Sequence, residues 1–452
     1  MKNGFDNEKY LKIQSEQIKK RIAQFGDKLY LEFGGKLFDD NHASRVLPGF
    51  LPDSKLRMLT QLKDEAEIII VISSLDIEKN KVRGDLGITY DEDVLRLKNE
   101  FENIGLHVSS VVITHYNGQA SADSYRKRLE RKNIKVYYHY TIEGYPNNVA
   151  LIDSEEGFGK NDYVETTRPL VVVTAPGPGS GKMAVCLSQL YHENKRNIKS
   201  GYAKFETFPV WNLPLKHPVN LAYEAATADL NDLNMIDPFH LEAYGETAVN
   251  YNRDVDAFPV LRRILHAITG SDEGYKSPTD MGVNRCGFAI TDDEACREAA
   301  IQEIIRRYLI AECSYRKGTI DAATLERCKL LMEEVGASRY DRPAVAAAEE
   351  YAEIKRAQNP QRYENVVVSA MQLPDGSIVT GRSSRRMVAT AAMVLNAIKK
   401  ELEENGGVLP AVETAPAETE TVEIPVEEPD ADPVVEIELT VEDTAEAPAD
   451  AE

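Results

Sequence analysis

LVVVTAPGPGSGKMAVCLSQLY, residues 170–191, decides which fold the rest of the chain is expected to adopt. The apolar, β-branched run Leu170–Val173 predicts a buried strand, and the apolar residues after Lys182 recur at helical spacing. Strand, glycine-rich loop, lysine and helix is the order of a phosphate-binding loop. In such a loop, backbone N–H groups, the helix N-terminus and the lysine face an anion. The candidate anion-binding residues are Gly177, Gly179, Ser180, Gly181 and Lys182.

The match to the phosphate-binding pattern GxxxxGK[ST] departs from it at two positions. Pro176 stands at the first glycine position, and Met183 stands where a hydroxyl residue would hold Mg²⁺. Either another group places the metal, or the loop binds a phosphorylated ligand that is not hydrolysed. A tight strand-to-helix turn without a ligand is the structural alternative. The sequence favours anion binding and leaves the cofactor open, with ATP or another nucleotide and Mg²⁺ as one choice.

Composition sets the broad class of protein. A chain of 452 residues with 42% hydrophobic content is long enough for about two or three domains. Fifteen acidic residues and no Lys or Arg lie between Gly406 and Glu452, which leaves a formal charge of −6 for the rest of a chain whose net charge is −21. No basic block is long enough to follow a nucleic-acid backbone. We therefore expect no nucleic-acid partner.

The chain shows no signal for export or membrane insertion. The N-terminus, MKNGFDNEKYLKIQ, lacks the apolar core of a signal peptide, and no run of about 18 apolar residues occurs. The five cysteines are widely spaced without a CxxC pair, which favours reduced thiols over a disulfide framework or a zinc site. These features predict a cytoplasmic protein without a membrane partner.

Strand and helix patterns alternate through the first half of the chain. Such alternation implies crossover connections and a mostly parallel sheet, with ligands at the carboxyl ends of the strands. The turn FGGK, which contains Lys36, is a second and weaker candidate for approaching an anion, with a hairpin turn as its alternative. The predicted strands are Lys28–Phe33, Glu67–Ser73, Val108–Thr114, Ile134–Tyr140 and Val149–Ile152, and the predicted helices are Asn7–Gln24, Asp91–Ile104 and Ser121–Arg131.

The segment Gly201–Asp280 is broken by prolines and rich in groups that bind ligands or transfer protons. Long irregular stretches with many polar side chains are more often functional than idle. Arg253 is a candidate phosphate or carboxylate clamp, and His217, His240 and Asp254 are the acid/base candidates. The alternative is structural, with Arg253 and Asp254 in the solvated first turn of a helix Arg253–Ile268 that Asn250 and Asn252 cap.

The remaining chain is predicted to be helical scaffold, a small subdomain and a tail. Helices are expected at Asp292–Ser314, Asp321–Val335 and Pro343–Ala357, then a hairpin at Asn365–Thr380 and a helix at Ser384–Leu402. The fold class is thus α/β, a mostly parallel sheet with a phosphate-loop-like strand–loop–helix, a helical lobe and a small C-terminal α+β subdomain. The expected division is an α/β domain (1–230), a helical lobe with a site-lining segment (231–358), an α+β subdomain (359–405) and a disordered acidic tail (406–452).

Several long strings resemble a bacterial family known as a domain of unknown function, number 1846 (uncharacterised protein family 0371). They are LEFGGKLFDDNHASRVLPGF, TAPGPGSGKMAVCLSQLYHE, GYAKFETFPVWNLPLKHPVNLAYEAATADL, DPFHLEAYGETAVNYNRDVDAFPVL and YKSPTDMGVN. The resemblance covers roughly residues 1–404 and implies a bacterial α/β protein with a helical insert and a small C-terminal α+β subdomain. The family has no established reaction.

The chain departs from this family in two respects. Some relatives carry a label of ATP-dependent zinc protease, but His192-Glu193 lacks a second histidine four residues after His192, so no HExxH zinc motif occurs. Relatives continue with more strands and helices after Ser384–Leu402, where this chain has its acidic tail. The expected last subdomain is therefore incomplete.

Three functional hypotheses follow. The first is a cytosolic enzyme for phosphoryl transfer or ATP-driven ligation, with a phosphorylated small molecule on Gly177–Lys182 and Arg253 as a second clamp. The second is a non-catalytic sensor of a phosphorylated metabolite, in which Met183 marks the loss of Mg²⁺ chemistry. The third is an assembly protein whose acidic tail recruits partners. Each hypothesis leaves open whether the protein forms a homo-oligomer.

Overall fold

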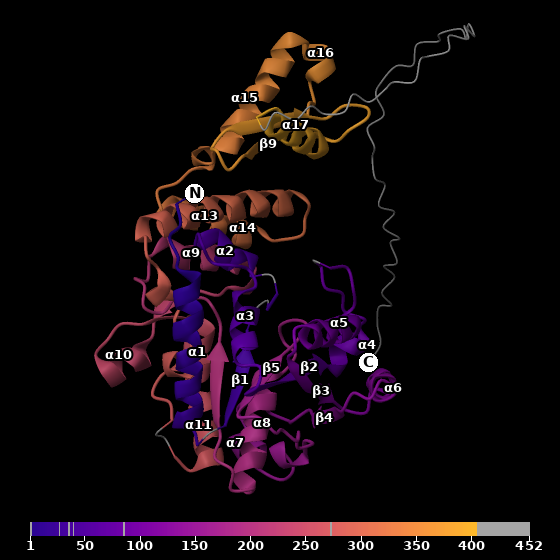
Figure 1. Ribbon diagram of the computed structural model, residues 1–452, viewed down its shortest axis with the longest axis vertical. Coiled ribbons are helices and arrows are strands. Elements are labelled where there is room, and N and C mark those ends of the chain that lie inside the picture. Colours follow the sequence, from indigo (N-terminus) through magenta and orange to yellow (C-terminus); the bar gives the residue numbers. More distant parts are fainter. Residues whose placement is uncertain are drawn as a thin grey trace, which may run out of the picture. The chain divides into compact units, whose positions relative to one another are not determined.

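The computed structural model describes residues 2–26, 28–34, 37–38, 40–84, 86–271 and 274–404 (Figure 1). The candidate Lys36 and the predicted acidic tail, residues 406–452, lie outside this part of the chain. The chain divides after Val394. All strands among the described residues belong to the first unit, and of the second unit the structure describes the end of the last helix.

A six-stranded parallel sheet is the framework of the described residues. Its strand order is β4-β3-β2-β5-β1-β6. The apolar, β-branched sequences of β2 (AEIIIVIS) and β5 (LVVVT) suit strands that are buried on both faces, and every residue of both is buried. The strands are β1 Leu29–Phe33, β2 Ala66–Ser73, β3 His107–Tyr116, β4 Val136–Tyr140, β5 Leu170–Thr174 and β6 Gly201–Phe205.

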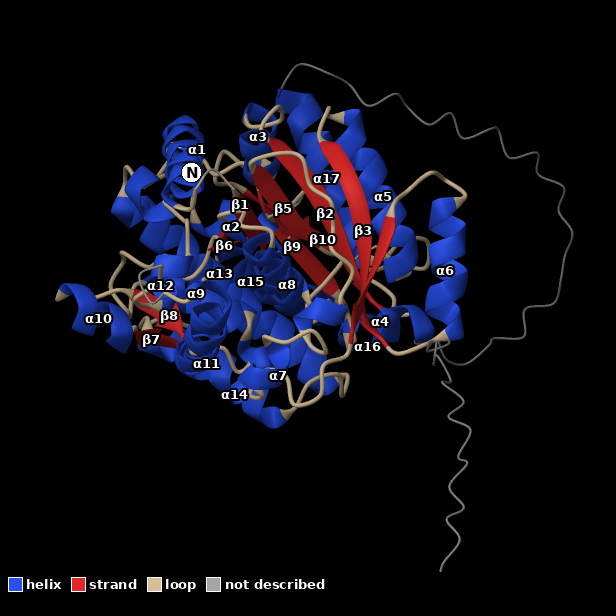
Figure 2. Ribbon diagram, turned by 90° about the horizontal axis from the view of Figure 1, so that it is seen from below, coloured by secondary structure: helices blue, strands red, loops and turns tan. Residues whose placement is uncertain are grey.

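Helices cover both faces of this sheet (Figure 2). On one face, Tyr30, Val171 and Tyr202 pack with apolar residues of α8 (Lys182–Lys195) and α11 (Asn252–Thr269). On the other face, alternate strand residues such as Leu31 and Ile70 pack with helices from the N-terminal part of the chain. Those helices are α1 Asn7–Gln24, α2 Asn41–Val46, α3 Ser54–Gln61, α4 Ser74–Glu78, α5 Tyr90–Asn103 and α6 Ala120–Glu130.

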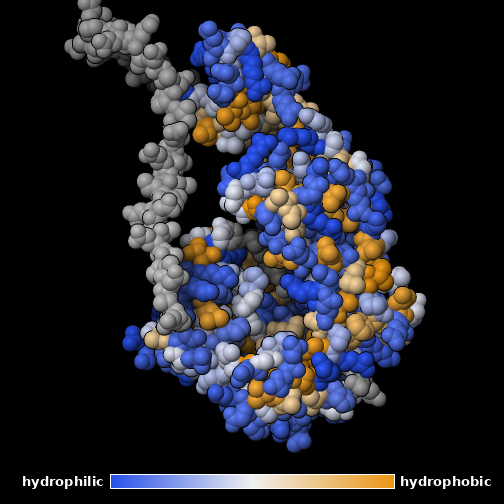
Figure 3. Space-filling view, turned by 180° about the vertical axis from the view of Figure 1, so that it is seen from behind, coloured by the Kyte–Doolittle hydropathy of each residue, from blue (hydrophilic) through white to orange (hydrophobic). Residues whose placement is uncertain are grey.

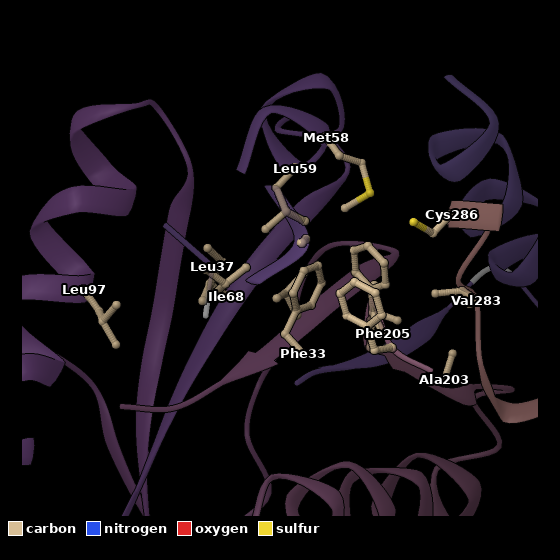
Figure 4. Close-up of a cluster of buried hydrophobic side chains, with 14 of the residues drawn as sticks. Phe33, Leu37, Met58, Leu59, Ile68, Leu97, Ala203, Phe205, Val283 and Cys286 are labelled. Atoms are coloured by element: carbon tan, nitrogen blue, oxygen red, sulfur yellow. The ribbon is translucent and has the colours of Figure 1, made fainter. Parts of the chain in front are cut away.

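The carboxyl ends of β1 and β6 are fixed by aromatic packing (Figure 4). Phe33 and Phe205 end the two strands, and their rings meet edge to face with centroids 4.8 Å apart. Both rings are buried among the side chains labelled in Figure 4, which include Met58 and Val283. This packing fixes the ends of β1 and β6. The opposite face of these strand ends carries charged residues.

Shorter elements follow the sheet. A two-stranded antiparallel ribbon joins β7 Asn234–Ile236 to β8 Val249–Tyr251, and a second joins β9 Val368–Gln372 to β10 Ile378–Arg382. The other helices are α7 Val149–Ile152, α9 Pro218–Ala226, α10 Pro238–Tyr244, α12 Pro278–Met281, α13 Asp293–Arg316, α14 Ala322–Glu334, α15 Pro343–Gln358, α16 Pro360–Tyr363 and α17 Ala389–Glu404, and short 3₁₀ turns lie at Phe158–Lys160, Ala228–Leu230, Cys286–Ala289 and Arg339–Asp341.

The structure confirms the predicted fold class. The parallel sheet, the strand–glycine loop–helix unit, the helices of the middle region and the small C-terminal pair of strands with helices are all present. One predicted strand is wrong: Val149–Ile152 forms the short helix α7, whose cap is the Asn148 side chain accepting from Leu151 N. The domain boundaries predicted at residues 230 and 358 stay predictions.

Candidate functional site

The topology of the sheet has a switch point between β2 and β5. From β2 the chain moves to β3 on one side of this point. From β5 it moves to β6 on the other side, beyond β1. Parallel sheets of this kind bind ligands outside the carboxyl ends of the strands at such a switch point. The glycine-rich loop follows β5 directly and therefore lies at this position.

The glycine-rich loop runs from Ala175 to Gly181 and forms one wall of a cavity of about 610 Å³. Gly179 and Gly181 have positive φ values of 75° and 84°, a conformation that favours glycine. The loop is tied down by two hydrogen bonds: Ser180 Oγ donates to the Gly177 carbonyl over 2.8 Å, and Thr114 Oγ1 donates to the Ser180 carbonyl over 2.6 Å. The Ser180 hydroxyl thus supports the loop itself.

Lys182 is the first residue of α8 and also lines this cavity. Its ammonium group makes no hydrogen bond or ion pair with any residue that the structure describes. The N-cap Gly181 offers α8 no side-chain cap. A lysine without a partner beside an uncapped helix N-terminus creates a positive potential facing the cavity.

The opposite wall of the cavity carries a charged cluster on the ends of β1 and β6. Lys204 on β6 lies in parallel register with Glu32 on β1. The Lys204 ammonium lies 2.7 Å from Asp254 Oδ2 and 3.1 Å from Glu206 Oε2, and it also donates to Tyr251 OH, which donates to Glu206. All of these charged side chains line the cavity.

The charged cluster shifts the pKa values of its members in different directions. Burial disfavours the charged form of Lys204, but Glu206, Tyr251 and Asp254 outweigh it and raise the pKa of Lys204 well above its usual range. Burial acts against ionisation of Glu206 too, yet Lys204 and the Tyr251 hydroxyl lower the pKa of Glu206. For Asp254, burial dominates over Lys204 and raises its pKa. Asp254 is therefore the carboxyl group of the cluster best suited to exchange a proton.

Arg253 lines the same cavity from the start of α11. Its guanidinium lies 3.4 Å from Asp232 Oδ2 and packs over the Tyr251 ring. The glycine loop with Lys182 and the pair Arg253-Asp254 thus share one cavity although they come from two separate parts of the sequence. The alternative interpretation has Asn250 and Asn252 capping this helix. In the structure α11 begins at Asn252, and Tyr251 occupies the N-cap position without a side-chain cap.

The two candidate histidines do not line this cavity. His217 caps α9: its ring accepts from Val219 N and its other nitrogen lies 2.9 Å from Asp293 Oδ1. His240 contacts the Ser277 hydroxyl and packs against Trp211. Each ring thus has structural partners in the part of the chain described. Their assignment as acid/base residues stays a prediction without geometric support.

Sequence reasoning did not single out Glu32, Glu206 or Asp232 as site residues. Tyr202, Lys204 and Glu206 follow the period-two alternation of β6 and its continuation. That alternation was the only available sign that Glu206 points the same way as Lys204. The pairing of β6 with β1, which brings Glu32 to the same place, involves residues 170 positions apart in the sequence, as the hydrogen bond from Tyr202 to Glu32 shows.

Two further features bear on the class of the protein. Among residues 2–404 that the structure describes, no three His, Cys, Asp or Glu side chains are grouped to hold a metal ion. The same residues contain no helix both long and apolar enough to span a bilayer. On the face drawn in Figure 3, hydrophobic side chains lie in small groups among hydrophilic ones.

The fold and the cavity define an α/β protein with a glycine-rich loop at the switch point of a parallel sheet. The chain belongs to the family described as Domain of unknown function DUF1846, whose N-terminal domain matches residues 3–336 and whose C-terminal domain matches residues 340–412. This confirms the predicted family.

Its relatives include proteins named UPF0371 protein from clostridia. The one from Clostridium botulinum (strain Langeland / NCTC 10281 / Type F) is 57% identical over 399 residues, which are 88% of this chain and 79% of the relative. The one from Clostridium tetani (strain Massachusetts / E88) is 57% identical over 400 residues, with the same coverage of 88% and 79%.

Proposed function

We propose that this protein is an enzyme that binds a nucleotide or another phosphorylated small molecule in the cavity beside the glycine-rich loop. The observation that carries the proposal is the composition of the cavity wall. One side presents groups suited to an anion, and the other presents a carboxyl group with a raised pKa beside Lys204, whose side chain is 14% exposed. Phosphate binding and proton transfer would thus occur within one cavity of about 610 Å³, a size typical of small-molecule sites.

The phosphate group would lie against Gly177–Lys182. The backbone N–H groups at the start of α8 point away from their own helix, and Lys182 adds a full positive charge that no described residue neutralises. Arg253 would hold the phosphate from the α11 side, since its guanidinium lies at the cavity wall and its ion pair with Asp232 spans 3.4 Å. Burial opposes the charge of Arg253, but Tyr251 and Asp232 raise its pKa, so the guanidinium is charged throughout the working pH range.

The reacting group would lie over Asp254. A carboxyl group with a raised pKa takes a proton from an attacking hydroxyl or amine more readily than an ordinary aspartate does. Lys204, 2.7 Å away, would stabilise the carboxylate after the proton leaves. This arrangement suits phosphoryl transfer or a ligation driven by ATP, in which a nucleophile attacks phosphorus or an activated carbonyl.

Mg²⁺ commonly accompanies such reactions, but the loop does not supply the usual hydroxyl. Met183 occupies that position, and the Ser180 hydroxyl donates to Gly177. The residues of the loop therefore do not fit a metal held in the manner of phosphate-loop NTPases. The same observation favours a second candidate function, a sensor that binds a phosphorylated metabolite without turning it over.

Thermal-shift measurements test the binding step. Purified protein is screened against nucleotides, sugar phosphates and pyrophosphate, with and without Mg²⁺, alongside Lys182→Ala. The matched control is Lys195→Ala in the last turn of the same helix, where the side chain is 57% exposed. A ligand at about 100 times its dissociation constant stabilises the fold by about 2.7 kcal/mol. We expect a shift in the wild type and in Lys195→Ala but a much smaller one in Lys182→Ala.

Turnover distinguishes the enzyme from the sensor. If the protein is an enzyme, Asp254→Asn retains the thermal shift of the bound compound but loses product formation in the presence of a second substrate. A sensor gives the shift and forms no product in either version. A screen in which no phosphorylated compound shifts the wild type, or in which Lys182→Ala responds like Lys195→Ala, contradicts both functions.

A further inference from the structure

A second cavity of about 620 Å³ adjoins the one beside the glycine-rich loop. The two cavities share five lining residues, Met183, Leu230, Asp232, Arg253 and Ala257. The two cavities therefore lie next to each other, with Arg253 and Asp232 in the walls of both. Together the two spaces exceed what phosphate with a single small sugar would occupy.

Asp232 lines both cavities, and no hydrogen bond to its side chain occurs among the residues that the structure describes. Its side chain is 4% exposed, and its Oδ2 atom is buried without a hydrogen-bond partner among the described residues. Arg253 approaches no nearer than 3.4 Å. A buried carboxylate oxygen without a donor is costly and rare in native proteins. A hydroxyl group of a ligand lying between the two cavities would supply the missing donor.

The second cavity combines apolar walls with solvent-exposed polar side chains. Val260, Leu261 and Ile264 of α11 form one wall, and Tyr145, which is 37% exposed, forms part of another. The side chains of Asn147, Asn231 and Asp256 also line it and make no hydrogen bond within the part of the chain that the structure describes. An acyl chain would leave these amide and carboxylate groups unused, whereas a heterocyclic base uses both the apolar faces and the polar edge.

We propose that the ligand is a nucleotide, with its phosphates on Gly177–Lys182, a sugar hydroxyl donating to Asp232, and its base in the second cavity. This inference rests on the proposed function, because it takes the phosphate position from it. It goes further in naming the substrate class and in assigning Asp232 and the α11 wall to sugar and base recognition. Tyr145 would contact the face of the base, and Asn147 or Asp256 would bind its edge.

A comparison of probes on the wild-type protein tests the substrate class. Calorimetric titrations use pyrophosphate, ribose 5-phosphate and the four common ribonucleoside diphosphates. We expect at least one nucleoside diphosphate to bind ten or more times more tightly than pyrophosphate and ribose 5-phosphate. If all probes bind equally and lose affinity in Lys182→Ala, the nucleotide inference fails while the proposed function stands. If no probe binds, both fail.

Two variants test the assigned positions. Val260→Trp fills the second cavity from the half-buried side of α11 and should remove the extra affinity for the nucleotide without reducing that for pyrophosphate. Asp232→Asn should weaken the nucleotide at least fivefold, whereas its pyrophosphate affinity should stay the same or rise because Arg253 loses its counter-charge. Equal weakening of both probes in Asp232→Asn would instead make Asp232 a residue that only positions Arg253, and would overturn its role in sugar binding.

Discussion

At the scale of single residues, two glycines of one loop are required for different physical reasons. A Cβ atom on Gly177 would lie 2.2 Å from the Tyr90 hydroxyl oxygen, so any side chain there forces the loop and Tyr90 apart. A Cβ atom on Gly179 would meet nothing within 4 Å, but the residue has φ +75°. The first position demands close approach, and the second demands a left-handed backbone.

Alanine substitutions at Gly177 and Gly179 should therefore respond differently to a change at Tyr90. Gly179→Ala should cost about 1–2 kcal/mol of unfolding free energy from backbone strain, and Gly177→Ala about 1–3 kcal/mol from overpacking. Urea denaturation of single and double variants measures this. Adding Tyr90→Ala should relieve part of the cost of Gly177→Ala and none of the cost of Gly179→Ala. Additive costs in both pairs would contradict the close-approach account.

At the scale of elements, length and periodicity decided which predictions succeeded. The predicted helix Asn7–Gln24 coincides with α1, since its apolar residues repeat over five turns and Asp6 caps it. The error at Val149–Ile152 arose because four apolar residues fit a strand and a helical turn equally well. Short helices such as α10 and α12 lie in a segment that showed no periodicity. They are held by side-chain contacts between distant residues, which a local pattern does not reveal.

Asp237 is the residue that joins these two short helices. It caps α10 by accepting from Phe239 N and His240 N, and it also accepts from Thr279 N and the Thr279 hydroxyl of α12. Asp237→Ala leaves these buried and partly buried donors unpaired and should cost about 3 kcal/mol. The control is Asp292→Ala, which removes only the cap bond to Ala295 N and should cost about 1 kcal/mol. Equal losses in urea unfolding would show that Asp237 is an ordinary cap.

At the scale of the whole molecule, the sequence predicted the parts of the site but not how they come together. Lys182, Arg253 and Asp254 were recognisable from their local surroundings. The strand order that inserts β5 between β2 and β1 brings them to one cavity with Glu32 and Lys204. That order depends on packing across the entire sheet, and single-sequence patterns contain no information about which strands become neighbours.

The same global packing makes stability depend on pH. Burial lowers the pKa of five histidines: His42, His115, His139, His192 and His217. For His139, burial lowers the pKa from 6.5 to about 3. The unfolded chain therefore binds protons below pH 6.5 that the folded protein does not. These buried histidines therefore cost no stability above that pH, and they lower the free energy of unfolding as the pH falls below 6.5, for His139 down to about pH 3.

Replacing one of these histidines measures how much it contributes to the pH dependence of stability. Between pH 7.5 and pH 5.5, protonation of the unfolded state should cost about 1.4 kcal/mol for His139, since one pH unit below 6.5 corresponds to 1.36 kcal/mol. Urea unfolding at both pH values should show that His139→Gln loses about 1.4 kcal/mol less than the wild type. His107→Gln, the same change at an exposed position on β3, should lose as much as the wild type. An unchanged pH dependence in His139→Gln would mean that its imidazole is protonated within the folded protein, and that the sheet edge at β4 admits water.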